Sequence, residues 1–359
     1  MIGTHYLTNK MNLLVCGGAG FIGSAFIRNY LQNNRDSKLV NLDNLTIGSN
    51  LHNLKEIENN TNYQFIKDDI RNESKIDSLV KDVDTVINFA AESHVDRSIA
   101  NPKPFLETNI LGTYSILEAT RKHDKQFIHV STDEIYGDAE NKSSFDENSQ
   151  VNPSNPYAAT KAAADHLVSS YYRTYGINCI TTRCTNNFGP NQFPEKLIPK
   201  TIIRAVKNLK IPLYGDGQQI RSWIYVYDHV QAIESLISKG KAGQIYNITA
   251  YEEITNKSIV EKILDILGKP YSMIEYVGDR PGHDKRYSIN CSKIESLGWK
   301  PKYQFEKALQ DTVDWYLQNK SWWEPLINKN TLHPQPWTIK HKKNCTGRDS
   351  RNLIFTKRR

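Results

Sequence analysis

Short apolar runs rich in β-branched residues alternate with longer amphipathic stretches between residues 12 and 184. The runs are NLLVCG (12–17), KLVNLD (38–43), YQFIKDD (63–69), DTVINFA (84–90), QFIHVST (126–132) and INCITTRC (177–184). Repeated β-α units of this kind form a parallel sheet covered by helices, and strands buried on both faces read as continuous apolar runs. We therefore predict an α/β fold with a doubly wound parallel sheet.

The sequence after Cys184 is richer in loops. Pieces punctuated by Pro and Gly, such as FGPNQFPEKLIP and GDRPGHDKR, separate helices that we predict near 196–208, 256–268 and 303–319. The segment GQIYNIT (243–249) again reads as a strand of the main sheet. Because ligands bind outside the carboxyl ends of parallel strands, we predict a smaller, interleaved substrate-binding domain here. The predicted boundaries are 11–185 with return segments at about 224–250 for the first domain, and 186–223 with 251–325 for the second.

Positive charge is concentrated at the C-terminal end of the chain. The formal net charge is +7, and residues 340–359 contain eight Lys or Arg against the single Asp349, which is also a balance of +7. The rest of the chain is therefore neutral, and nucleic-acid binding is not expected. We predict that residues 338–359 are a basic, disordered tail and that residues 1–10 are a disordered extension.

Neither a membrane segment nor a metal site is indicated by the sequence. No apolar run approaches the roughly 20 residues that a membrane-spanning helix needs, and the first ten residues are too polar for a secretory signal. The five Cys contain no CxxC pair, and the ten His show no HxH or HExxH spacing. We expect a cytoplasmic protein without a membrane partner or a bound metal.

The first predicted strand runs into glycines with the spacing G-x-x-G-x-x-G. Gly17, Gly20 and Gly23 stand at a strand-to-helix turn, where they let the main chain approach a pyrophosphate at a helix N-terminus. Asp43 follows 20 residues after Gly23, where a carboxylate binds a ribose diol and repels a 2′-phosphate. We predict a Rossmann fold that binds NAD rather than NADP. Residues beside the glycines and at the ends of later strands would border the NAD. Taken alone they would be interpreted as ordinary turns and helix caps. They are Phe21, Ile22, Asp69, Ile70, Phe89, Ala90 and Ala91.

Tyr157 and Lys161 stand four residues apart at the start of a predicted helix, so their side chains lie on one face. Most YxxxK pairs are ordinary helix surface. Beside a dinucleotide site, the Lys161 ammonium and the nicotinamide charge would lower the pKa of the phenol. Tyr157 is therefore a candidate base toward a sugar hydroxyl, coupled to hydride transfer.

The fifth predicted strand ends in Thr132, Asp133 and Glu134, at the edge of the sheet where reactive groups collect. Thr132 could hydrogen-bond the same hydroxyl as Tyr157. Two adjacent carboxyl groups in unlike environments can divide into a proton donor and a proton acceptor. The alternative is a loop with helix-capping acids, which would be favoured if Tyr157 were absent.

Together these motifs resemble the extended short-chain dehydrogenase/reductase superfamily and, within it, the dTDP-glucose 4,6-dehydratase family. The resemblance spans about residues 11–325. The Thr-Asp-Glu triplet is its most discriminating part, because related 4-epimerases lack the Asp-Glu pair, while decarboxylases and GDP-mannose dehydratases have Ser or Thr before the Glu. The matching segments are GGAGFIG, DNLT, AAESHVDRSI, STDEIYGD, NPYAATKAAAD, RCTNNFGPNQFPEKLIP, RSWIYVYDH and DRPGHDKRY.

What the resemblance implies is conversion of dTDP-glucose to its 4-keto-6-deoxy sugar with tightly held NAD, as in rhamnose and other deoxysugar biosynthesis. Tyr157, assisted by Thr132 and Lys161, would take the C4 hydroxyl proton as hydride passes to NAD. Glu134 would remove the C5 proton while Asp133 protonates the departing C6 hydroxyl, and hydride would return to C6. It also implies a homodimer in which helices at about 104–123 and 155–175 pair with their counterparts.

The same resemblance implies which residues bind the ligands. Ser93, Thr108 and Asn187 would lie near the nicotinamide, and Asn44, Leu45 and Thr46 near the adenosine. Guanidinium groups suit a diphosphate because they bind it in a bidentate way, and an aromatic ring offers a face to a base. The implied substrate set is His94, Thr132, Asn186, Lys196, Leu197, Pro212, Leu213, Tyr214, Arg221, Asn256, Asp279, Arg280 and His283.

One position departs from the family pattern. The family has Asp after the arginine of R-D-W, whereas Ser222 stands between Arg221 and Trp223 here. Losing the carboxylate removes a partner that would orient Arg221. We hypothesise that the base pocket accepts UDP-glucose as well as dTDP-glucose.

The sequence leaves two other functions open. A nucleotide-sugar 4-epimerase or a decarboxylase of the same superfamily would oxidise C4 but would not need Asp133 and Glu134 as a donor-acceptor pair. A non-catalytic NAD-binding regulator belongs to another class. It would be expected to have lost at least one of the five residues of the catalytic set, and all of them are present in the chain.

Overall fold

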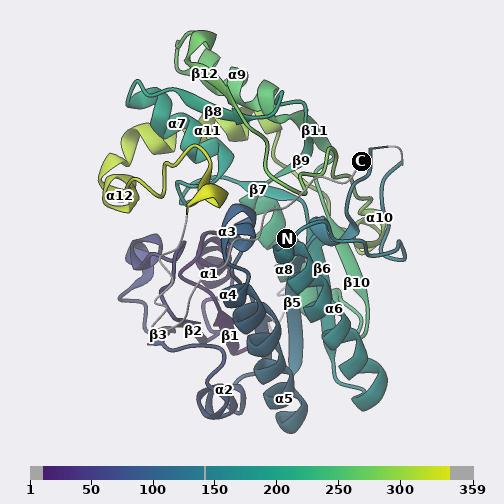
Figure 1. Ribbon diagram of the computed structural model, residues 1–359. Helices are drawn as coiled ribbons and strands as arrows, with labels where there is room; N and C mark the ends of the chain where they lie inside the picture. The colour runs from purple at the N-terminus through teal and green to yellow at the C-terminus, as the bar shows by residue number, and fades with distance from the viewer. Residues whose placement is uncertain (1–10, 141–142, 340–359) are drawn as a thin grey trace, which may run out of the picture.

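Seven parallel strands form the main sheet of the computed structural model, which describes residues 11–140 and 143–339 (Figure 1). Their order is β10-β6-β5-β4-β1-β2-β3, so the predicted doubly wound sheet is confirmed. The predicted extension at 1–10 and residues 340–359 of the predicted tail lie outside the described residues. The strands are β1 (Leu13–Cys16), β2 (Leu39–Asp43), β3 (Tyr63–Lys67), β4 (Thr85–Asn88), β5 (Gln126–Thr132), β6 (Cys179–Cys184) and β10 (Ile245–Ile248).

Helices cover both faces of this sheet, and each buries one apolar stripe against it. Phe26 and Ile233 are among the side chains that fill the core on one face, and Ile116 and Val168 are among those on the other. The helices of the first face are α1 (Phe21–Asn33) and α8 (Val226–Lys239); those of the second are α2 (Glu73–Val80), α5 (Thr113–His123) and α6 (Pro156–Tyr175).

The helix predicted at 104–123 is divided into three segments. A short α4 (Lys103–Phe105) leads into a π-helical segment, η2 (Leu106–Gly112), before α5 begins. A Cβ atom at Gly112 would lie 2.3 Å from Cδ1 of Ile70, so the segment approaches the end of the sheet closely. The amphipathic pattern alone does not reveal this wide turn. Such π-helical turns occur often at functional sites, and Thr108 on this one lines the pocket described below.

A second, smaller unit lies over the carboxyl ends of the strands (Figure 1). It holds a three-stranded sheet in the order β11-β9-β7 and a two-stranded sheet of β12 and β8. Its core packs Trp223 and Phe305 against the helices. The elements are β7 (Asn186–Phe188), α7 (Leu197–Val206), β8 (Ile211–Tyr214), β9 (Ile220–Tyr225), β11 (Glu252–Thr255), α9 (Asn256–Ile266), β12 (Ile274–Val277), α11 (Phe305–Gln318) and α12 (Lys320–Trp323).

The chain passes between the two units more than once. After β9 it returns to the main sheet through α8 and β10, and then re-enters the smaller unit at β11. Within the described residues, no helix combines the length and apolar character that crossing a bilayer requires. The remaining short elements are η1 (Leu51–Ile57), α3 (Val95–Ala100), η3 (Asp133–Tyr136), η4 (Tyr271–Met273), α10 (Ser292–Glu295), η5 (Glu324–Leu326) and η6 (Pro336–Thr338).

Candidate active site

Glycine is required at one position in the turn between β1 and α1 and at one position in the first turn of α1. Gly17 has φ +79°, and a Cβ atom there would lie 2.5 Å from the main-chain N of Ala90. A Cβ atom at Gly23 would lie 2.3 Å from the carbonyl oxygen of Gly17. Gly20 precedes the first residue of α1, and no side chain caps the helix. The first amides of α1 are therefore free to bind an anion.

We expect Gly17→Ala to destabilise the fold and to empty the dinucleotide site. The positive φ costs about 1–3 kcal/mol for a residue with a side chain, and the contact with Ala90 adds to this. Denaturant unfolding and the NAD content of the purified protein measure the two effects. Gly176→Ala is the matched control, because Gly176 has φ +70° but nothing within 4 Å of its Cβ position. A Gly17→Ala protein that keeps its NAD would contradict the assignment.

Asp43 ties the end of β2 to the glycine turn. Its carboxylate accepts hydrogen bonds from the main-chain N–H groups of Ala19 (3.0 Å) and Leu45 (2.8 Å). Burial raises the pKa of Asp43, and these main-chain donors oppose that rise. Asp43 lines the pocket, whereas Leu45 does not; Leu45 has φ +56° at the turn that follows β2.

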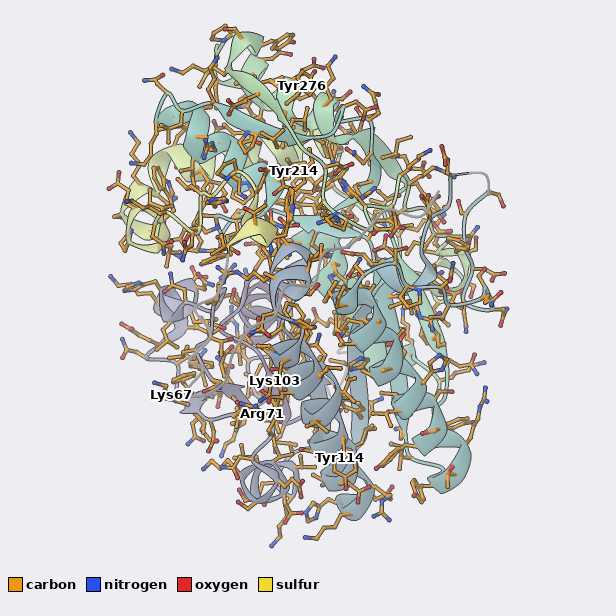
Figure 2. All side chains as sticks on the ribbon, viewed as in Figure 1. Lys67, Arg71, Lys103, Tyr114, Tyr214 and Tyr276 are labelled. Carbon is orange, nitrogen blue, oxygen red and sulfur yellow. The ribbon has the colours of Figure 1, made fainter. Side chains whose placement is uncertain are left out.

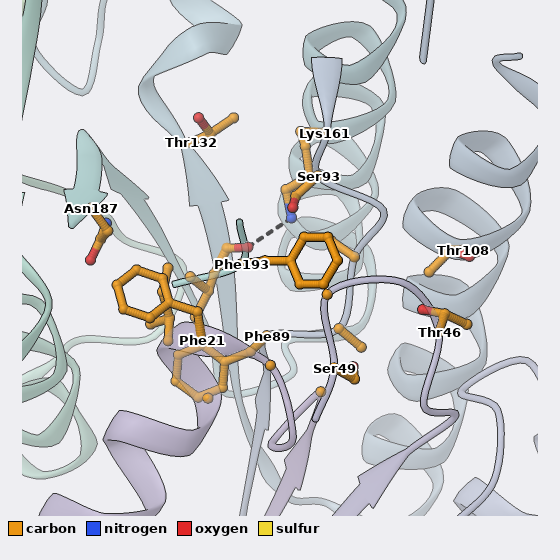
Figure 3. Close-up of a pocket in the computed structure, with 18 of the residues that line it drawn as sticks. Phe21, Thr46, Ser49, Phe89, Ser93, Thr108, Thr132, Lys161, Asn187 and Phe193 are labelled. Atoms are coloured by element: carbon orange, nitrogen blue, oxygen red, sulfur yellow. Dashed lines mark hydrogen bonds between the residues drawn. The ribbon is translucent and has the colours of Figure 1, made fainter. Parts of the chain in front are cut away.

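One pocket runs from the glycine turn along the carboxyl ends of the strands (Figure 3). Thr46, Ser49 and Thr108 lie at one side in this view, and Thr132 and Asn187 at the other. The pocket is lined by every residue predicted for the cofactor except Leu45, and by all five residues predicted for catalysis. Sequence reasoning missed these lining residues: Leu42, Ile47, Gly48, Ser49, Asp68, Val130, Ser131, Cys184, Thr185, Gln192 and Phe193.

Tyr157 and Lys161 enter the pocket from the first turns of α6. The helix starts at Pro156, and the side chain of Asn155 caps it by accepting a hydrogen bond from the N–H of Ala158 (2.9 Å). Nζ of Lys161 donates to the carbonyl oxygen of Val130 (2.7 Å; dashed in Figure 3). Burial lowers the pKa of Lys161 to about 8.

The expected lowering of the pKa of Tyr157 is not found in the protein alone. Burial raises this pKa well above its ordinary value, and Glu134 and Cys184 raise it further. A hydrogen bond with Thr132 acts in the opposite direction. The reason is that Tyr157 is 8% exposed and faces two acidic groups, so the phenolate loses its solvation without gaining a cation in contact.

A buried polar network that the sequence did not reveal lies next to Lys161, on the side away from the pocket. His129 on β5 places Nε2 3.5 Å from Nζ of Lys161 and 3.5 Å from Oδ1 of Asp165. Asp165 on α6 also accepts a hydrogen bond from Nε of Arg183 (2.9 Å), and Arg183 donates to the hydroxyl of Tyr136 (2.7 Å). The Asp165 charge opposes the fall in the pKa of Lys161. These residues fix the position and the charge of Lys161 without lining the pocket.

The two adjacent acids have different surroundings. Asp133 is 3% exposed, and its Oδ2 has no hydrogen-bond partner among the described residues. Burial and the neighbouring Glu134 raise the pKa of Asp133 well above its ordinary value. Glu134 is only partly buried, with Oε2 at 3.4 Å from both the side-chain amide of Asn155 and the hydroxyl of Tyr287. Burial therefore favours the protonated form of Asp133, next to an acid that is more exposed to solvent.

The predicted substrate residues fall into three groups. Thr132, Asn186 and Lys196 line the pocket. Leu213 is a core residue instead, 2% exposed and packed in the same apolar cluster as Val260. Outside the lining of this pocket lie His94, Leu197, Pro212, Tyr214, Arg221, Asn256, Asp279, Arg280 and His283.

Asp96 on α3 joins two of these outer residues across the two units. Its Oδ2 accepts a hydrogen bond from the Tyr214 hydroxyl (2.9 Å), and its Oδ1 pairs with Arg280 (3.0 Å). Nearby, His94 lies 3.4 Å from Glu195, and burial lowers the pKa of His94 to about 4, so the ring is neutral. Lys196 donates to the carbonyl of Ser93 (2.9 Å). Two cationic groups, Lys196 and Arg280, interact electrostatically with Glu134 and so lie on the outer side of the Asp133–Glu134 pair.

Arg221 has partners despite the serine that follows it. Its guanidinium donates to the carbonyl oxygens of Ile220 (2.7 Å) and Asp284 (2.8 Å) and lies 4.1 Å from the centre of the Tyr287 ring. Ser222 is buried, and its hydroxyl donates to the carbonyl of Tyr287 (3.3 Å). The absence of a carboxylate at 222 therefore does not leave Arg221 without orientation.

Comparison with known proteins agrees with this geometry. The family model described as GDP-mannose 4,6 dehydratase matches residues 14–312. The chain belongs to this family. It is 44% identical to a dTDP-glucose 4,6-dehydratase of Xanthomonas campestris pv. campestris, over 88% of this chain and 95% of that protein. It is 47% identical to the low-salt glycan biosynthesis protein Agl12 of Haloferax volcanii, over 86% of this chain and 99% of that protein.

Solved structures extend the comparison. The dTDP-glucose 4,6-dehydratase of Bacillus anthracis in complex with NAD has a TM-score of 0.84 at 44% identity, covering 88% of this chain and 100% of that one. DesIV, a dTDP-glucose 4,6-dehydratase of Streptomyces venezuelae with NAD and TYD bound, has a TM-score of 0.87 at 42% identity and the same coverage. A UDP-glucose 4-epimerase of Thermus thermophilus has a TM-score of 0.79 at 29% identity, over 86% of this chain and 100% of that one. The predicted resemblance to the dehydratase family is confirmed.

Proposed function

We propose that the chain is an NAD-dependent dTDP-glucose 4,6-dehydratase, a hydro-lyase that converts dTDP-glucose to the 4-keto-6-deoxy sugar. The observation that carries this proposal is the pair of acids in the pocket: Asp133 is buried with a raised pKa, and Glu134 beside it is partly solvated. Both share the pocket with Tyr157 and with the glycine turn. The relatives named as dTDP-glucose 4,6-dehydratases support it.

The residues of the pocket fit NAD. Glycine is required at 17 and 23, the amides at the start of α1 carry no side-chain cap, and Asp43 offers its carboxylate to a ribose diol. We propose that residues 11–185 with 224–250 form the domain that holds the cofactor, and that 186–223 with 251–325 hold the substrate. When bound, NAD supplies the hydride acceptor for C4 and the hydride donor for C6.

The proposed order of proton transfers follows from acidity. Tyr157 takes the proton of the C4 hydroxyl. Thr132 makes a hydrogen bond with Tyr157, and a hydrogen bond to the carbonyl oxygen of Val130 holds Lys161 near the site. A C5 proton becomes acidic only once C4 is a ketone, so Glu134 acts second. Asp133 then gives its proton to the departing C6 hydroxyl. Asp133 lines the pocket and its Oδ2 has no hydrogen-bond partner among the described residues, so this atom is available for that contact.

We propose that the diphosphate lies against the cations beyond Glu134. Lys196 lines the pocket, and Arg280 and Arg221 come from the smaller unit. Tyr214 would then face the nucleoside end. Other groups orient Arg221, so the only remaining support for acceptance of UDP-glucose is that Ser222 departs from the family pattern. Competition between dTDP-glucose and UDP-glucose tests whether UDP-glucose is accepted.

The rival within the superfamily is a 4-epimerase, and the fold alone does not exclude it, because an epimerase structure superposes well. Oxidation at C4 and return of hydride to the same carbon need no acid for a leaving C6 oxygen. The buried carboxyl group of Asp133, whose pKa is raised, has no task in that reaction. A regulator that only binds NAD would have no use for the Tyr157–Lys161 pair either.

We expect the purified protein to remove one water from dTDP-glucose without added NAD. Mass spectrometry of separate incubations with dTDP-glucose, UDP-glucose and GDP-mannose measures the product and names the accepted base. An unchanged mass in every tube would point to the epimerase or to the silent binder. NMR of the same samples separates those two, because an epimerised sugar keeps its mass.

We also propose a homodimer. Apolar side chains are exposed along η2 and α5, among them Leu106 at 49%, Leu111 at 54% and Tyr114 at 40%, and Tyr175 on the adjacent α6 is 54% exposed. Tyr114 is labelled in Figure 2. A second copy of the same helices would bury them, as the resemblance implies. Light scattering that reports a monomer would refute this proposal.

A further inference from the structure

The segment that follows η5, residues 331–338, lies between the two units of the molecule. Figure 1 shows this yellow part of the chain next to α3, on the side where the smaller unit meets the main sheet. Arg204 and Lys200 on α7 donate to the carbonyl oxygens of Leu332 (2.6 Å) and His333 (3.4 Å). The match to the family model ends at residue 312, before this segment begins.

Two side chains of the segment contact the wall that carries the outer substrate residues. The ring of Trp337 meets that of Tyr214 edge to face, with centroids 4.7 Å apart and planes at 86°. The side-chain amide of Gln335 donates to the carbonyl oxygen of Gly278 (3.1 Å). Gly278 directly precedes Asp279, whose carboxylate accepts hydrogen bonds from His283 (2.6 Å) and from the main-chain N–H of Arg280 (2.8 Å).

Tyr214 is therefore held at both ends. Asp96 accepts the hydrogen bond of its hydroxyl, and Trp337 packs against its ring. Asp96 also pairs with Arg280, so the same contacts set the position of a guanidinium beyond Glu134. A substrate with its sugar at Tyr157 and Glu134 and its diphosphate at Arg280 reaches Tyr214 with the part that lies farther along, which is the nucleoside.

We propose that Trp337 is a positioning residue for the nucleoside end of the substrate, acting through Tyr214, and that Gln335 supports the same wall through Gly278. This inference rests on the proposed function for the identity of the substrate. An aromatic pair of this geometry contributes a factor of about three to ten to an equilibrium constant. Loss of Trp337 leaves Tyr214 fixed at its hydroxyl only, so binding weakens while the reacting groups stay in place.

The test compares Trp337→Ala, Trp337→Phe and Gln335→Ala with the wild type. Tyr276→Ala is the control, because Tyr276 is an exposed tyrosine on β12 (55% exposed), and its label in Figure 2 lies apart from that of Tyr214. Calorimetry measures the Kd of dTDP, and steady-state kinetics give KM and kcat with dTDP-glucose. Thermal unfolding and NAD content report on the fold.

We expect Trp337→Ala to raise the Kd of dTDP and the KM about tenfold with kcat within about twofold, and Trp337→Phe to restore most of the affinity. Gln335→Ala should raise both constants by about threefold and Tyr276→Ala should change neither. Unchanged Kd and KM in Trp337→Ala, or a lower kcat at constant KM, would overturn the inference. If Trp337→Ala does not fold, Trp337→Phe and Gln335→Ala decide it by the same criterion. A wild type that binds dTDP but forms no dehydrated sugar defeats the proposed reaction alone, and the Kd comparison still decides this inference.

Discussion

Replacing Tyr157 with phenylalanine is expected to lower turnover of dTDP-glucose by about 10²–10⁴-fold, the usual contribution of a positioned acid or base. The change removes one oxygen and leaves the ring that packs against Phe105 (centroids 6.4 Å apart), so the fold and the NAD site should persist. Burial and Glu134 raise the pKa of the phenol, so Tyr157 acts as a base only where the Thr132 hydrogen bond, the Lys161 ammonium and the charge of a bound nicotinamide together offset that rise. Single-turnover kinetics with dTDP-glucose measure the loss.

Tyr171→Phe on the same helix is the matched control. Tyr171 is buried like Tyr157, and its hydroxyl donates to Glu118 (2.5 Å) outside the pocket lining. We expect it to change stability slightly and turnover hardly at all. A loss of activity that is equal in the two variants would show that a buried tyrosine on α6 serves the fold, and the role of Tyr157 as base would be withdrawn.

Most residues that the sequence predicts for the cofactor line one pocket, because local rules decide where they lie. A glycine turn after a strand and an acid at the end of the next strand meet wherever strands are parallel and adjacent, and β1 pairs with β2 in this sheet. Leu45 lies outside the pocket lining, and with φ +56° it occupies a turn conformation that the motif does not specify.

The substrate end depended on long-range contacts that no periodicity encodes. Leu213 sits in a strand, so its side chain points opposite to that of Tyr214, and it packs into a core with Leu264. Gln192 and Phe193 reach the pocket from the loop after β7 without any pattern of their own. His129 and Asp165 are 36 residues apart and meet only because β5 and α6 pack together.

Replacing Asp133 with asparagine is expected to slow formation of the dehydrated sugar by about 10²–10⁴-fold while C4 oxidation continues. An amide cannot give a proton to the departing C6 hydroxyl, whereas Tyr157 and Lys161 are untouched. A 4-keto hexose that keeps its C6 oxygen should therefore accumulate, and chemical trapping followed by mass spectrometry detects it. Exchange of the C5 proton with D₂O should persist, because Glu134 remains.

The fold of this variant should not suffer at neutral pH. The raised pKa of Asp133 means that its contribution to stability is present below the ordinary pKa range of a carboxyl and is lost as the pH rises through the higher pKa of the folded state. Asparagine removes this cost, so the free energy of unfolding near pH 7 should be equal to or above that of the wild type. Asp146→Asn, at an exposed position, should change neither stability nor turnover.

Replacing Glu134 with glutamine should have an effect different in kind from that of Asp133→Asn. Without the carboxylate at 134, C5 exchange should disappear together with water loss, and C4 oxidation should remain. The difference in C5 exchange between the two variants separates the roles of the two acids, and a change in stability would not produce it. If Asp133→Asn and Glu134→Gln abolish C5 exchange to the same extent, the division into donor and acceptor is wrong. The two acids would then act as one unit in the elimination.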